Sequence, residues 1–162
     1  MKDSRENMFQ ILENVVFLKK NRLFGSMHTR DLRALSAIAE EMSFDLGATI
    51  VREGDVGDSL FIIRSGSVRI EKKDEAGESL LLAHLAANEY FGEMALFDAE
   101  VRSASVIAAE ACVLLCIRSD DLNDVLMENP SIALEFLKTF AKRIRELNHR
   151  AEELTLGAAA GA

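Results

Sequence analysis

The sequence has fewer basic than acidic residues, with 19 Lys and Arg against 27 Asp and Glu, a net charge of −8 and a pI near 4.9. Nucleic-acid binding rests mainly on phosphate contacts and needs a basic face, so we expect no direct nucleic-acid partner. An anionic membrane surface is disfavoured for the same reason. The chain also has no run of 18 or more apolar residues, and we expect neither a membrane-spanning helix nor a signal peptide.

Cysteine is scarce, and both copies, Cys112 and Cys116, lie in one apolar segment. In a strand they would stand about 13 Å apart, at roughly 3.3 Å per residue, which is too far for a disulfide between them. Two unpaired thiols in an apolar segment are typical of a reducing compartment. We therefore expect a cytoplasmic protein.

The common catalytic and metal-binding motifs are missing as well. The sequence contains no GxxxxGK[ST], GxGxxG, HExxH, CxxC or GxSxG pattern, and its three histidines are scattered. Residues 53–58 (EGDVGD) lack the 12-residue spacing and final glutamate of a calcium-binding EF-hand loop. Only His84 lies on an expected strand, whereas a cupin-type enzyme would need a histidine cluster there. We expect no catalytic residue, no metal and no cofactor.

The chain does show a helix-rich beginning followed by a strand-rich middle. Residues 6–20 and 30–41 place their apolar side chains at partly helical spacing. From residue 42 the pattern changes to short strands separated by glycines, a pattern typical of a closed all-β sandwich or barrel. The expected strands are 42–46, 49–52, 59–64, 67–72, 79–85, 105–108 and 112–117.

Helical patterns return after residue 118. Ser119 and the acidic residues after it predict a helix start, and Pro130 predicts the start of the next helix. That last helix should run over 131–154, with an apolar stripe of 3–4 spacing. It either packs back on its own domain or pairs with a second copy, and we favour a homodimer. The stripe consists of Leu137, Phe140, Ile144, Leu147, Ala151 and Leu154.

The stretch 91–106 (FGEMALFDAEVRSASV) has the strongest pattern of a binding site. Gly92 has no Cβ, so backbone there can approach a ligand closely. Residues 93–97 favour a short helix whose first N–H groups attract an anion. Arg102 can return to the same place, with a planar fork of donors that matches a phosphate. Glu93 would repel a phosphate but suits a ribose 2′-hydroxyl, and Arg102 nearby would keep it ionised. An ordinary surface ion pair of Glu93 with Arg102 is the alternative.

This stretch resembles the phosphate-binding cassette of cyclic nucleotide-binding domains, the family of the regulatory subunits of cyclic-AMP-dependent protein kinase and of the catabolite activator protein. The resemblance rests on residues 91–96 (FGEMAL) and 102–106 (RSASV), and it continues over 44–70, where EGDVGDSLFII stands. Val101 replaces a proline that many members have, which removes no ligand contact. The ligand-binding residues implied are Gly92, Glu93, Met94, Ala95, Arg102, Ser103 and Ser105.

The resemblance implies a jelly-roll β-barrel (double-stranded β-helix), mainly β, with N-terminal helices and a long C-terminal helix. Arg102 and the amides of Ala95 and Ser103 would hold the cyclic phosphate, and Glu93 the 2′-hydroxyl. The C-terminal helix would close on the base as a lid, with candidate contacts Phe140, Ile144, Leu147 and Asn148. The Ser103 hydroxyl does not decide between the two bases, and we favour cyclic AMP over cyclic GMP.

The expected organisation is a helical lead-in at 1–41, a barrel at 42–118, lid or dimerisation helices at 119–156 and a disordered tail at 157–162. The expected function is a cyclic nucleotide sensor. It would act on an unknown protein effector in trans, or on a fused effector domain outside this sequence. The alternative is a jelly-roll protein-interaction module that no longer binds nucleotide.

Overall fold

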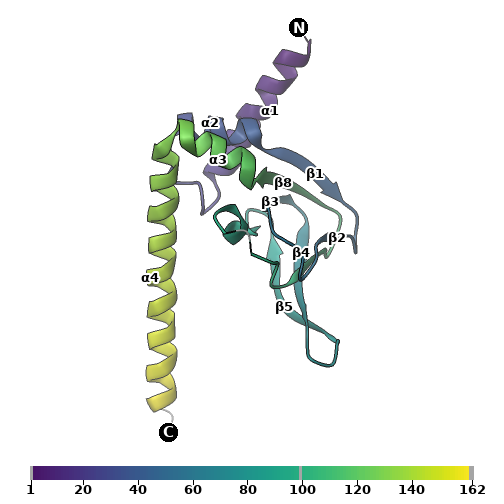
Figure 1. Cartoon of the computed structure of the whole chain (residues 1–162), viewed down its shortest axis with the longest axis vertical. Helices are drawn as coiled ribbons and strands as arrows, with labels where there is room; N and C mark the ends of the chain where they lie inside the picture. Colours follow the sequence, from purple (N-terminus) through teal and green to yellow (C-terminus); the bar gives the residue numbers. More distant parts are fainter. Residues whose placement is uncertain (1, 99, 161–162) are drawn as a thin grey trace.

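Two antiparallel sheets form the centre of the molecule in the computed structural model, which describes residues 2–98 and 100–160 (Figure 1). The strand order is β1-β8-β3-β6 in one four-stranded sheet and β2-β7-β4-β5 in the other. This is the arrangement of an eight-stranded jelly roll, so the expected fold class is confirmed. Among the described residues no strand ladder joins the two sheets, and the expected closed barrel is a double sheet instead. The strands are β1 Glu40–Phe44, β2 Thr49–Val51, β3 Ser59–Ser65, β4 Ser67–Lys73, β5 Ser79–Ala86, β6 Tyr90–Phe91, β7 Ser105–Ala108 and β8 Cys112–Arg118.

The strand β3 separates the two hydrophobic clusters of the fold. Its side chains alternate, as the period of a strand requires. Leu60 and Ile62 pack into the cluster shared with the helices, while Phe61 and Ile63 pack into the cluster between the sheets. All four are buried, which explains why the sequence shows a continuous apolar run at this place.

In the described part of the chain, four α-helices flank the sheets (Figure 1). The second helix was expected over 30–41 but ends at Ile38, because Glu40 already pairs with Cys116 across β1 and β8. The helical end of the molecule is built around the buried Phe24 and Phe136, whose rings meet edge to face with centroids 5.8 Å apart. The helices are α1 Lys2–Lys19, α2 Thr29–Ile38, α3 Ser119–Glu128 and α4 Pro130–Ala160.

Helix α4 is 31 residues long and runs from the α2–α3 end along one side of the sheets, with the C-terminus at the far end (Figure 1). The expected disorder from residue 157 is wrong for 157–160, which continue the helix; residues 161–162 lie outside the described part of the chain. Alanine has the highest helix propensity, so the run after Gly157 extends the helix despite its lack of packing groups. Within the described residues, no helix has the length and hydropathy needed to span a membrane.

Candidate functional site

A cavity of about 370 Å³ lies where β6 leads into the short 3₁₀ helix η1 (Glu93–Leu96). Its apolar part includes side chains from all four strands of one sheet: Val51 of β2, Val106 of β7, Ile70 of β4 and Leu85 of β5. The polar part comes from the cassette around η1 and from Arg143 of α4. One apolar wall and a few convergent polar groups are the usual composition of a small-molecule site.

Arg102 occupies a slot between two glycines. Gly92 has a left-handed backbone with φ of 82°, and a Cβ there would lie 2.5 Å from the Arg102 Nη1 atom and 2.7 Å from the Ser59 carbonyl oxygen. A Cβ on Gly57 would lie 3.0 Å from Arg102 Nε and 2.8 Å from the Cβ of Ala95. The sequence predicted a close backbone approach at Gly92, and the structure shows that the arginine itself fills the space.

The guanidinium of Arg102 donates a hydrogen bond to the Ser59 carbonyl oxygen at 2.8 Å. Burial lowers the pKa of Arg102, while the nearby Asp58 and Cys116 act to raise it. No carboxylate forms a salt bridge with Arg102 among the described residues. A partly buried cation without a directly paired anion is therefore available to an anionic group in the cavity.

Glu93 pairs with Arg143, not with Arg102. Arg143 Nη1 donates to Glu93 Oε1 at 2.7 Å, and the same atom lies 2.9 Å from the Tyr90 hydroxyl oxygen. The alternative of a direct Glu93–Arg102 ion pair is wrong among the described residues, because Arg102 is turned into the glycine slot. Sequence reasoning missed Arg143, which lies 50 residues away on a helix with several other cations.

Burial acts to lower the pKa of Arg143, but Glu93 and Tyr90 outweigh it, and the pKa is raised above its ordinary value. Burial also raises the pKa of Tyr90, partly opposed by Arg143. The Arg143 guanidinium lies 5.6 Å from the centroid of the Tyr90 ring, a cation–π arrangement. At neutral pH Arg143 is thus a cation and Tyr90 a neutral phenol, both at the edge of the cavity.

Six of the seven expected ligand-binding residues line the cavity: Gly92, Glu93, Met94, Ala95, Arg102 and Ser103. Ser105 does not line the cavity. Its hydroxyl accepts a hydrogen bond from the Glu53 amide at 2.9 Å, which ties Ser105 to the loop after β2. The Ala95 amide donates to the Gly92 carbonyl oxygen at 3.2 Å, a long bond within the 3₁₀ turn that a phosphate oxygen could replace.

The expected lid residues do not line this cavity. The ring centroid of Phe140 lies 5.8 Å from that of Phe97 and 6.0 Å from that of Phe136. The contact with Phe97, which follows η1, joins α4 to the cassette. Ile144 and Asn148 are exposed, and Leu147 lines a neighbouring pocket. Closure of α4 over a bound base therefore stays a prediction.

Sequence comparison agrees with this geometry. The family model described as "Cyclic nucleotide-binding domain" matches residues 41–129, more than half of the chain. A "CRP-like cAMP-activated global transcriptional regulator" of Mycobacterium tuberculosis is 28% identical over 137 residues, which cover 85% of this chain and 61% of that protein. The "cGMP-dependent protein kinase, isozyme 2 forms cD5/T2" of Drosophila melanogaster is 28% identical over 155 residues, covering 94% of this chain and 17% of the kinase.

Comparison with solved structures gives the same result. The N-terminal domain of a transcriptional regulator from Streptomyces coelicolor superposes with a TM-score of 0.76 and 30% identity, covering 83% of this chain and 94% of that domain. The chain spans less than two thirds of the length of the curated relatives named above. The matched segment contains both sheets and the cassette, and by this match the chain belongs to the cyclic nucleotide-binding domain family.

Proposed function

We propose that the chain binds a cyclic nucleotide reversibly and that Arg102 holds the cyclic phosphate. The observation that carries this proposal is the glycine slot. It holds a half-buried arginine at the wall of a cavity of about 370 Å³, and within the described residues the guanidinium bonds only to a carbonyl oxygen. A cyclic phosphate has a single negative charge, which one arginine and the amides of Ala95 and Ser103 can neutralise.

Glu93 holds the ribose 2′-hydroxyl in this proposal. Its carboxylate is an acceptor for that hydroxyl, and it already accepts a hydrogen bond from Arg143. A ribose at Glu93 therefore competes with Arg143 or rearranges the pair. Because Arg143 belongs to α4, ligand binding changes the contacts of α4, and movement of this helix is the output signal.

Cyclic AMP is the favoured ligand over cyclic GMP. The Mycobacterium tuberculosis relative is named for activation by cAMP, which supports this preference, whereas the Drosophila relative is a cGMP-dependent kinase. The cavity wall of Val51, Ile70 and Leu85 is apolar and makes no distinction between the two bases. Competition between the two nucleotides decides the preference.

The exposed stripe of α4 pairs with a second copy of the chain. Four large apolar side chains on it are more than half exposed: Leu137, Ile144, Leu147 and Leu154. Phe140, which also belongs to the stripe in the sequence, packs inside its own domain and does not take part. The signal from α4 then passes to a protein effector, in trans or on the same polypeptide.

Replacing Arg102 by Ala tests the site directly. Loss of the partner of a partly buried anion costs about 2–5 kcal/mol, or roughly 30- to several-thousand-fold in affinity. Arg118→Ala is the matched control, since Arg118 forms an exposed ion pair with Glu40 at 3.7 Å and lies outside the cavity. Titration calorimetry with cyclic AMP measures both. An unchanged affinity in Arg102→Ala contradicts the proposal.

A further inference from the structure

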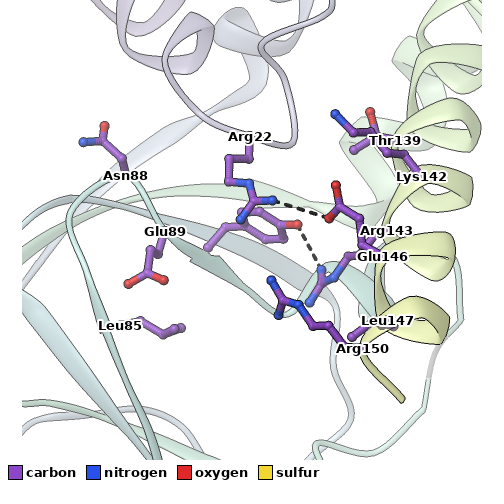
Figure 2. Close-up of a pocket in the computed structure, with 11 residues that line it drawn as sticks. Arg22, Leu85, Asn88, Glu89, Thr139, Lys142, Arg143, Glu146, Leu147 and Arg150 are labelled. Atoms are coloured by element: carbon purple, nitrogen blue, oxygen red, sulfur yellow. Dashed lines mark hydrogen bonds and ion pairs between the residues drawn. The ribbon is translucent and has the colours of Figure 1, made fainter. Parts of the chain in front are cut away.

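A second pocket of about 300 Å³ lies beside the nucleotide cavity, between α4 and the turn that joins β5 to β6 (Figure 2). The two hollows share Leu85, Tyr90 and Arg143 as a common wall. Arg102 does not line the second pocket, and neither does Glu93. It is therefore distinct from the site proposed for the cyclic phosphate.

Positive charge is concentrated at this pocket in a chain of net charge −8. Four cationic side chains line it, against two carboxylates. Figure 2 shows three arginines pointing toward the same space, Arg22 from the segment after α1 and Arg143 and Arg150 from α4. Like charges that converge repel each other, so the arrangement favours a bound anion.

The two lining carboxylates, together with Glu93 on Arg143, offset only three of the four positive charges. Glu146 is bound to Arg22 through a long contact of 3.5 Å. Glu89 accepts a hydrogen bond from the Ala86 amide at 2.7 Å, so its carboxylate is engaged by backbone. Within the described residues, Arg150 forms no salt bridge, and Lys142 forms none either.

We propose that this pocket binds a small phosphate anion with two or more negative charges, either inorganic or carried as the diphosphate of a nucleotide. The planar forks of arginines match phosphate oxygens, and three of them suit a multiply charged group better than a cyclic phosphate. The hydroxyls of Tyr90 and Thr139 supply further donors. A volume of about 300 Å³ is at the lower end for small-molecule sites, which fits a small anion.

A bound anion also affects the nucleotide cavity, because Arg143 lines both hollows. This guanidinium pairs with Glu93 at 2.7 Å and at the same time lines the second pocket. An anion there draws Arg143 away from Glu93 and leaves the carboxylate to a ribose. This step rests on the proposed function, whereas binding of the anion itself does not.

Calorimetric titration with sodium pyrophosphate, in buffer of low ionic strength without divalent metals, tests the pocket. The double variant Arg22→Ala/Arg150→Ala should bind at least about tenfold more weakly than wild type, since two charge-assisted contacts are lost. Arg145→Ala is the matched control, an exposed arginine of the same helix that lines neither hollow, and should stay within about twofold. Added salt should weaken binding in wild type.

Arg102→Ala separates this proposal from the preceding one. This variant should retain pyrophosphate binding even though it loses cyclic nucleotide binding. The two measurements therefore show which of the two proposals has failed. ADP titrated into Arg102→Ala distinguishes the source of the anion: tighter binding than pyrophosphate indicates a nucleotide diphosphate, and weaker binding indicates a free anion. Absence of pyrophosphate binding at millimolar concentration overturns the proposal. So does equal affinity in the double variant, or loss of binding in Arg102→Ala.

Discussion

Arg143 on α4 donates a hydrogen bond to Glu93 on the cassette at 2.7 Å, and so joins the C-terminal helix to the carboxylate proposed for the ribose. The Glu93 side chain is 15% exposed and the Arg143 side chain 45% exposed. Water therefore screens the pair in part, and its strength lies between that of a surface and a buried salt bridge. The same ion pair can thus hold α4 in this position and still yield to a ligand.

A double-mutant cycle with Glu93→Gln and Arg143→Gln measures this pair. We expect a coupling free energy of about 0.5–1 kcal/mol in urea unfolding, decreasing at high salt because the pair is partly exposed. A coupling of zero at low ionic strength would show that the two side chains do not interact in solution.

Gly92→Ala should destabilise the protein by about 2–4 kcal/mol, because the new Cβ meets Arg102 and the Ser59 carbonyl oxygen in a left-handed backbone. It should also weaken cyclic nucleotide binding at least roughly tenfold, since Arg102 is displaced. Gly77→Ala is the matched control: its φ is 84° but its Cβ meets no atom within 4 Å. The control should cost only about 1–2 kcal/mol and leave affinity unchanged. If both variants have equal effects on stability in urea unfolding and on affinity in calorimetry, the placement of Arg102 against Gly92 is contradicted.

The sheets could be predicted from the sequence because strand alternation and glycine turns are local signals. Seven of the strands were expected close to their observed bounds, whereas the two-residue β6 is too short to leave a pattern. The cassette residues were found because they are close in sequence and share a known pattern.

The partner of Glu93 could not be predicted in the same way. Its identity depends on how α4 packs against the cassette, which is set by the aromatic contacts of Phe140 with Phe97 and Phe136. Such tertiary contacts leave no periodic signal in a single sequence. The hydrogen bond of Ser105 could not be predicted for a related reason, since it joins the Ser105 side chain to the Glu53 amide, 52 residues away in the chain.

Helix α4 should mediate dimerisation. A helix of 31 residues is about 46 Å long at 1.5 Å per residue, and its stripe of exposed leucine and isoleucine is unusual for an isolated surface. Wild type should sediment as a dimer at micromolar concentration, and Ile144→Glu/Leu154→Glu as a monomer with retained secondary structure. Arg145→Glu on the same helix should remain dimeric. A wild type that sediments as a monomer at every concentration contradicts the prediction.

The two cysteines should be unreactive in the native protein. Both are buried, and burial raises the pKa of Cys112 and of Cys116, where a hydrogen bond with Ser59 partly opposes the shift. A raised thiol pKa means that the neutral form is favoured by folding. The contribution of each neutral thiol to the free energy of unfolding is complete below the thiol pKa of the unfolded chain. It is lost as the pH rises through the thiol pKa of the folded protein. Iodoacetamide at pH 7.5 should therefore label neither thiol until denaturant is added, and rapid native labelling would contradict the packing of β8.

Thermal unfolding with saturating cyclic AMP, cyclic GMP or AMP tests the central claim most directly. A ligand at about 100 times its Kd stabilises the native state by roughly 2.7 kcal/mol, which raises the Tm of a domain of this size by about 5–10 °C. The account predicts such a rise with cyclic AMP, a smaller one with cyclic GMP at the same concentration and none with AMP. Absence of any shift with either cyclic nucleotide at millimolar concentration would contradict it.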